Sequence, residues 1–96
     1  MHDIQIKNDL NFYYTVYPNP SDEFINIAYS LDTEILLSIE LVNLLGQKIK
    51  TVLSKQNQQA GTYTLQIPVS DFSTGTYFLI ISSANQTKTE KIIINK

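Results

Sequence analysis

Cysteine and arginine are absent from this 96-residue chain, and histidine occurs once, as His2. Without cysteine the chain can form neither a disulfide bond nor a thiolate metal site. One histidine cannot supply a Ser/His/Asp triad or a histidine metal cluster. Carboxylates are scattered, with Asp22 and Glu23 as an adjacent pair that reads as a solvated strand edge. We therefore expect no enzymatic activity, no cofactor and no metal.

The lack of arginine also limits the kinds of partner that the chain can bind. All seven basic residues are lysine, and the net charge is -2. Arginine is the side chain that contacts phosphates and base edges in a bidentate manner, so nucleic-acid binding is disfavoured. No apolar run approaches the roughly 20 residues that span a bilayer. Residues 1–11 lack a basic segment followed by an apolar one, so we expect neither a transmembrane segment nor a signal peptide in this sequence.

What the chain does contain is typical of β-strands. Six Tyr and four Phe occur with many Ile, Val and Thr, against only three Gly and three Pro. Residues 23–31 alternate with period two, and residues 37–41 repeat the scheme. The alternation predicts that these side chains face the core: Ile25, Ile27, Tyr29, Leu31, Leu37, Ile39 and Leu41.

Turn signals divide the chain into short strands. Residues 43–47 contain Asn43 and Gly46, which take positive φ readily, and residues 54–60 are polar like an exposed connection. The remaining strands are predicted at residues 12–17, 48–53, 61–67, 77–81 and 87–95. Seven short strands predict an all-β, Ig-like antiparallel β-sandwich over residues 12–96, with residues 1–11 as a linker to an upstream domain. A helix over residues 34–45 remains the alternative on propensity.

Two glycines begin a repeated Gly-Thr-Tyr triplet, at Gly61 and at Gly75. We interpret the repeat as two similar hairpin entries. In the second triplet, Tyr77 follows a turn at residues 71–75, so its hydroxyl is expected to form a corner hydrogen bond like that of Ig domains.

Three short motifs occur in order along residues 12–96. The first is Tyr-Pro-Asn-Pro at residues 17–20 before Ile-Asn-Ile, and the second is Leu-Leu-Gly-Gln-Lys-Ile at residues 44–49. The third is Gly-Thr-Tyr-Phe-Leu at residues 75–79, followed by Lys-Ile-Ile-Ile-Asn-Lys at residues 91–96. Together these motifs resemble the type A C-terminal sorting domain of the type IX secretion system of Bacteroidota.

This resemblance implies a function without catalysis. Such domains end exported proteins, pass through the periplasm after a signal peptide is removed, and direct an upstream cargo domain through outer-membrane secretion machinery. A sortase-like protease at the cell surface then removes the domain in many members. The implied destination is the cell surface or the extracellular space, and residues 1–11 would contain or adjoin the cleavage region.

The candidate recognition residues follow from the motifs and from their backbone properties. Prolines fix φ and remove backbone donors, so the first motif should hold a rigid segment that presents its backbone. If the last strand lies at a sheet edge, it could pair with a partner strand, or weakly with a second copy, and Lys88, Lys91 and Lys96 would guard that edge. The candidates are Tyr17, Pro18, Asn19, Pro20, Gly46, Gly75, Tyr77, Lys91, Ile92, Ile93, Ile94 and Lys96.

Three other interpretations remain open from the sequence. Turn Gly, turn Pro and edge Lys recur in any sandwich, so the same residues could be purely structural. An Ig-like accessory module that binds carbohydrate or mediates adhesion is the alternative function, and an exposed aromatic row on one face would favour it. A spacer between domains is less favoured, because the last predicted strand runs almost to the final residue.

Overall fold

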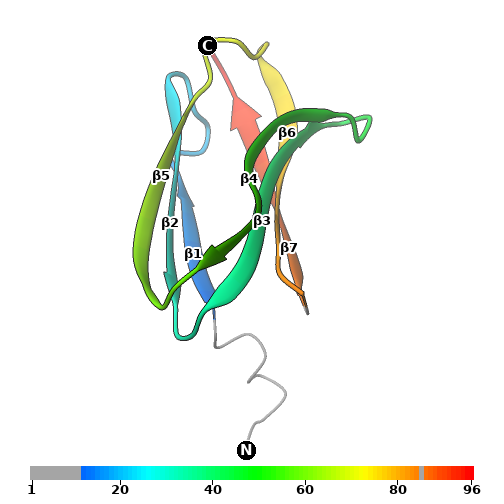
Figure 1. The fold of residues 1–96 in the computed structure, drawn as a ribbon. Helices are drawn as coiled ribbons and strands as arrows, with labels where there is room; N and C mark the ends of the chain where they lie inside the picture. The colour runs from blue at the N-terminus through cyan, green and yellow to red at the C-terminus, as the bar shows by residue number, and fades with distance from the viewer. Residues whose placement is uncertain (1–11, 85) are drawn as a thin grey trace, which may run out of the picture.

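A computed structural model describes residues 12–84 and 86–96, in which all regular structure is β-strand (Figure 1). The strands are β1 (Phe12–Tyr17), β2 (Phe24–Leu31), β3 (Ile35–Asn43), β4 (Lys48–Gln58), β5 (Gly61–Pro68), β6 (Gly75–Ser82) and β7 (Thr87–Ile94). The predicted seven-stranded, all-β sandwich is confirmed. The alternative of a helix over residues 34–45 is wrong, because β3 occupies that segment and its apolar residues alternate between two faces.

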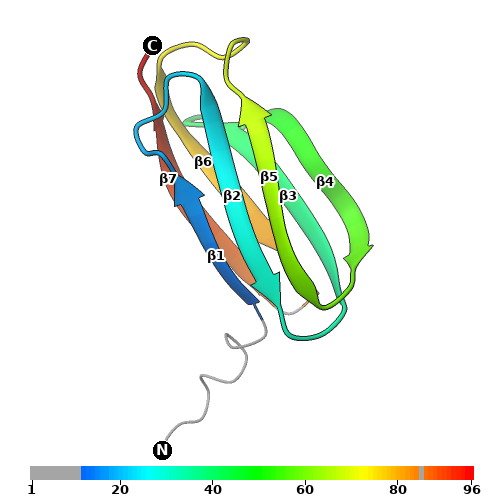
Figure 2. The ribbon, with the colours of Figure 1, turned by 90° about the vertical axis from the view of Figure 1, so that its left-hand side faces the viewer.

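The strands form two antiparallel sheets that face each other (Figure 2). One sheet has the order β1-β2-β5 and the other has the order β4-β3-β6-β7. In constant-type Ig domains the sheets hold four and three strands, with the fourth strand beside the fifth. Here β4 pairs with β3 in the second sheet instead, which leaves β5 as an edge strand.

Period-two patterning produces the core between the sheets. Burial alternates at every residue along β2, and Ile25, Ile27, Tyr29 and Leu31 all point inward as predicted. The core is completed from both sheets by Leu37, Ile39, Leu41, Ile67, Val69, Tyr77, Leu79, Ile81, Ile92 and Ile94. Burial of these side chains is the main source of stability in a chain without disulfides.

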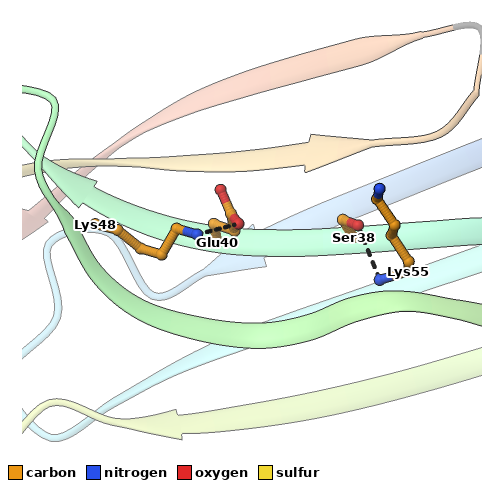
Figure 3. Close-up of polar contacts among 4 residues, drawn as sticks. All are labelled: Ser38, Glu40, Lys48 and Lys55. Carbon is orange, nitrogen blue, oxygen red and sulfur yellow. Dashed lines mark hydrogen bonds and ion pairs between the residues drawn. The ribbon is translucent and has the colours of Figure 1, made fainter.

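The polar segment at residues 54–60, predicted as a loop, is strand as far as Gln58. Its residues pair with β3 through register shifts, and Lys55 takes a positive φ of 48° at one of these irregularities. The Lys55 amide donates to the Ser38 hydroxyl at 3.0 Å, as Figure 3 shows. The prediction failed because β4 is an edge strand with mostly exposed side chains, so no alternation of hydrophobicity marks it.

Both Gly-Thr-Tyr triplets build the same corner. The prediction that they enter hairpins is wrong, because β4 and β6 lie in the sheet opposite to β5 and each connection crosses between the sheets. The Tyr63 hydroxyl donates to the Gln59 carbonyl at 2.6 Å, and the Tyr77 hydroxyl donates to the Ser73 carbonyl at 2.7 Å. Each tyrosine therefore fixes the connection before its own strand, by bonding a carbonyl four residues earlier in the chain. The predicted corner bond of Tyr77 is confirmed.

Strand direction divides the sandwich into two ends. At the proximal end lie the start of β1 and the connections β2–β3, β4–β5 and β6–β7. At the distal end lie the connections β1–β2, β3–β4 and β5–β6, together with residues 95 and 96 after β7 (Figure 1). The start of β1 and the end of β7 are therefore at opposite ends of the sandwich.

Candidate functional site

The β1–β2 connection lies against the outer edge of β7. The Ser21 amide donates to the Ile93 carbonyl at 2.8 Å, and the Asn95 amide donates to the Ser21 carbonyl at 2.8 Å. These bonds make Ser21 a parallel bridge partner of Ile94. Ser21 is only 1% exposed, and its hydroxyl donates to the Pro18 carbonyl at 2.7 Å. Burial of this polar side chain is thus offset by a hydrogen bond.

Asn19 extends the same contact by its side chain. Its Nδ2 donates to the Lys91 carbonyl at 3.0 Å, and its Oδ1 accepts from the Ile93 amide at 3.0 Å. A carboxamide carries one donor side and one acceptor side, so it can replace a peptide group beside a strand. Asn19 and Ser21 together therefore act as a short additional strand on the edge of β7.

The contact of Asn19 and Ser21 with β7 changes the prediction that residues 91–96 form an edge open to a partner strand. β7 is an edge strand of its sheet, but the outward groups of Lys91, Ile93 and Asn95 just described already have partners within the chain. Strand addition by a partner or by a second copy at this position would have to displace Asn19 and Ser21. The expectation that the proline segment at residues 17–20 presents its backbone stays a prediction, except at Pro18, whose carbonyl already accepts from the Ser21 hydroxyl at 2.7 Å.

The last residue is tied to the β5–β6 loop. The Lys96 amide donates to the Thr74 hydroxyl at 3.2 Å, and the Lys96 Nζ donates to the Ser70 carbonyl at 2.8 Å. The loop is held to the other sheet, since the Val69 amide donates to the Glu23 carbonyl at 3.0 Å. Lys96 thus does more than guard an edge, because it joins β7 to both ends of the β5–β6 loop, at Ser70 and at Thr74.

Tyr77 and Gly75 complete the arrangement from β6. Tyr77 is 8% exposed, its ring lies 6.1 Å from that of Phe72, and it pairs with Ile92 across the sheet. Gly75 pairs with Ile94 in the same register. We call the whole assembly the distal cap; it consists of residues 17–23, 69–77 and 91–96.

The structure brings most of the predicted residues together in this cap and divides them by exposure. Tyr17, Pro18, Asn19, Pro20, Lys91, Ile93 and Lys96 are exposed, whereas Tyr77, Ile92 and Ile94 are buried and Gly75 is intermediate. Buried members can shape the cap but cannot contact a partner. The exposed members are the ones able to be recognised.

Gly46 lies at the same end but belongs to the β3–β4 turn. Its φ is +82°, as the turn prediction requires, and its amide donates to the Asn43 carbonyl at 3.0 Å. Asn43 Oδ1 accepts from the amides of Leu45 and Gln47 at 2.9 and 3.0 Å, and its Nδ2 donates to Gln47 Oε1 at 2.8 Å. The Asn43 side chain therefore organises the whole turn.

Sequence reasoning missed three residues at this end. Ser21 reads as an ordinary polar residue after proline, yet it is the most buried polar side chain of the cap. Leu44 and Leu45 were quoted only as part of a motif, yet they are 66% and 82% exposed. The available signal was two leucines inside a turn bounded by Asn43 and Gly46, where side chains cannot reach the core.

Away from the cap, the electrostatics are dominated by tyrosine. The pKa of Tyr14 is raised to about 12 by burial, by its 2.8 Å hydrogen bond to Glu90 and by the charge of that carboxylate. Burial and the neighbouring Tyr63 raise the pKa of Tyr29. Tyr13 is 52% exposed on β1, in the same strand as Tyr14.

Among residues 12–84 and 86–96, no three or more His, Asp or Glu side chains lie close enough together to hold a metal ion. Among the same residues, no helix has the length and apolarity needed to cross a membrane.

Comparison with family models gives a match over most of the chain. The family model described as "Secretion system C-terminal sorting domain" matches residues 15–95, from the middle of β1 to the residue that bonds Ser21. No curated protein sequence matches the chain. The matched segment thus contains almost all of both sheets and of the distal cap.

Proposed function

This chain belongs to the family of secretion system C-terminal sorting domains, and we propose that its distal cap is the surface read by the secretion machinery. A domain of this family is a C-terminal sorting signal for type IX secretion. It is attached to a cargo and directs export to the cell surface or the extracellular space. A family of sorting signals is not a family of enzymes.

One observation carries the proposal about the cap. The three recognition motifs extend over 79 positions of the chain, counted from 17 to 96; the first and third meet in the cap, and the second lies at the same end of the sandwich. The start of β1 lies at the opposite end. A cargo joined before β1 would therefore leave the cap unobstructed.

Different residues of the cap have different tasks in this proposal. Asn19 and Ser21 hold β7 in place, while the buried side chains of Ile92 and Ile94 anchor it in the core. Ile93 is 39% exposed between them, Lys91 is exposed two residues before it, and Tyr17 is exposed at the end of β1. We assign the contact with the machinery to these three exposed side chains, together with Pro20 and Lys96.

We further propose the course of the attached protein. Residues 1–11, which lie outside the described residues, serve as the linker between the cargo and the sorting domain at residues 12–96. The protein crosses the periplasm before export, and a sortase-like protease then cleaves within or beside the linker. The mass of the exported cargo measures this directly, since cleavage removes the domain and an uncleaved product keeps it.

The test of the cap is a fluorescent cargo fused before residues 1–96 in a bacterium with type IX secretion. Deletion of residues 91–96 would be ambiguous, because it removes Ile92 and Ile94 from the core. The sharper variant combines Ile93→Ser with Lys91→Glu, which changes two exposed side chains and keeps the backbone contacts of β7. Leu36→Ser is the matched control, since Leu36 is 46% exposed on β3 towards the proximal end.

We expect export of the wild type and of the Leu36→Ser control, with retention of the cap variant. Urea unfolding of each purified domain checks that all three remain folded. Equal export of all three proteins would show that the cap is not the surface that is read. Retention of the wild type itself would contradict a sorting role for this chain.

A further inference from the structure

Leu44 and Leu45 form the most exposed large hydrophobic surface of the described residues, at 66% and 82%. Single exposed leucines are common on protein surfaces, but these two are adjacent at the tip of a hairpin. We call this pair the leucine knob. Ile49, 38% exposed just beyond the turn, continues the apolar surface towards the body of the sandwich.

The turn that carries the knob is organised before any partner arrives. Asn43 receives or makes hydrogen bonds with Leu45, Gly46 and Gln47 through its side chain and carbonyl. The Asn43 amide donates in addition to the Gln47 carbonyl at 3.0 Å. A tip fixed in this way loses little conformational entropy on binding.

The polar side chains around the knob are already engaged. Gln47 accepts from Asn43 within the turn, and Lys48 Nζ lies 3.0 Å from Glu40 Oε2 at the base of the hairpin (Figure 3). Residues 43–47 contain no charged side chain. The tip therefore offers a partner two leucines and little else.

We propose that the leucine knob inserts into an apolar socket on a protein component of the type IX secretion machinery. This inference rests on the sorting function and names a second contact besides the distal cap. The knob is convex, so it fits a concave apolar site, the form that small hydrophobic recognition sites take. Knob and cap lie at the same end of the sandwich, where one partner can reach both.

Two other occupants fit the knob less well. Insertion into a bilayer would take the peptide groups of the tight turn into hydrocarbon together with only two leucines. A second copy of the chain would have to supply a socket. The hollow beside the β3–β4 hairpin has a volume of about 360 Å³ and is lined by Ile49, Lys50, Pro68, Asp71 and Phe72. Binding of a leucine there would remove the charged Lys50 and Asp71 from water, which is unfavourable.

The experiment uses the same cargo fusion with the double variant Leu44→Ser, Leu45→Ser. The double variant Leu44→Met, Leu45→Met keeps the apolar surface, and Leu36→Ser serves again as the control for an exposed leucine elsewhere. Replacing two leucines that become buried in the complex should weaken binding by roughly 100-fold or more. We therefore expect export to fall at least about tenfold in the serine variant and to stay near wild type in the other two.

Equal export of the serine variant and the wild type, with both domains folded, would overturn the proposal. So would equal loss in the serine and methionine variants, because that would point to the turn and not to its apolar surface. Retention of the wild type would instead contradict the sorting function. Normal export of the cap variant with loss in the serine variant would support the knob and reject the cap.

Two binding measurements exclude the other occupants. Co-sedimentation of the purified wild-type domain, but not the serine variant, with phosphatidylethanolamine and lipopolysaccharide vesicles would assign the knob to the membrane and overturn the proposal. Dimerisation that the serine variant abolishes, measured by analytical ultracentrifugation, would assign it to a second copy. A photo-crosslinker at position 45 should label an outer-membrane secretion protein in cells.

Discussion

The two ends of the sandwich carry the same Gly-Thr-Tyr corner but are held together differently. At the proximal end, Tyr63 bonds the Gln59 carbonyl and stacks on Tyr29 at a centroid distance of 5.0 Å. At the distal end, Tyr77 makes the equivalent bond, but the loop it fixes also receives Lys96 from the end of the chain. The proximal corner joins β5 to β2 and, through the Tyr29 hydroxyl, to Gln58 at 2.7 Å, whereas the distal corner also includes the β1–β2 connection and β7.

The difference lies in sequence separation. Asn19 reaches Lys91 and Ile93, which are 72 and 74 positions away, so the cap joins the first connection of the chain to its last strand. A change in the cap therefore disturbs three segments at once. A change at the proximal corner should disturb β2 and the end of β4, because Tyr63 stacks on Tyr29 and the Tyr29 hydroxyl donates to Gln58 Oε1 at 2.7 Å.

The largest effect should come from the buried side chains of β7. Ile94→Ala removes a side chain that is 0% exposed, and it should lower the free energy of unfolding by about 2–4 kcal/mol. Ile93→Ala, at 39% exposure, should cost less than about 1 kcal/mol. Urea unfolding measures both, and similar losses would show that β7 does not pack as described.

Asn19→Ala should have the next largest effect. It removes both side-chain bonds to β7 at an exposed site, so we expect a loss of about 1–2 kcal/mol and faster hydrogen exchange at the Ile93 amide. Asn26→Ala is the control, because Asn26 makes an exposed 3.2 Å bond to Gln66. An unchanged exchange rate at Ile93 would argue against the Asn19 contact.

Removing each corner hydroxyl compares the two ends directly. Tyr77→Phe should cost about 1 kcal/mol, because Tyr77 is buried and its bond to Ser73 is partly shielded from water. Tyr63→Phe should cost about half as much, since its bond to Gln59 is exposed. Thermal unfolding of the two variants ranks them, and the reverse order would remove the distinction between the corners.

The smallest effect should come from ionisation of Tyr14, whose hydrogen bond to Glu90 joins β1 to β7 outside the cap. The pKa of Tyr14 is raised to about 12, from an ordinary value of 10.0, so the folded state favours the neutral phenol. This contribution to stability is complete below pH 10 and is lost as pH rises towards 12. Urea midpoints from pH 9 to 12 should fall less steeply for Tyr14→Phe than for the wild type; parallel curves would contradict this.

Most of the fold could be predicted because period-two patterning is strong wherever one face of a strand is buried. β2 follows from this alternation, and β6 follows instead from the continuous apolar run at residues 77–81. The second half of β4 could not be predicted, since an exposed edge strand such as residues 54–58 needs no apolar alternation. Its strand structure comes from pairing with β3, which is a property of the tertiary fold.

The candidate site was predictable in composition but not in role. The motifs identified Asn19 and residues 91–96, yet nothing local indicates that the Asn19 side chain covers the strand they form. The exposure of Leu45 could not be predicted either, because leucine is a residue expected in the core. Both roles depend on where distant segments meet.

The contact of Asn19 and Ser21 with β7 also sets an order of events during synthesis. Residues 19 and 21 leave the ribosome long before residues 93 and 95, so their partners do not yet exist when the first two strands can pair. A polypeptide interrupted before residue 93 lacks the partners of Asn19 and Ser21 and cannot complete the cap. If the cap is the surface that is read, export tests whether translation was completed, and interrupted products stay inside the cell.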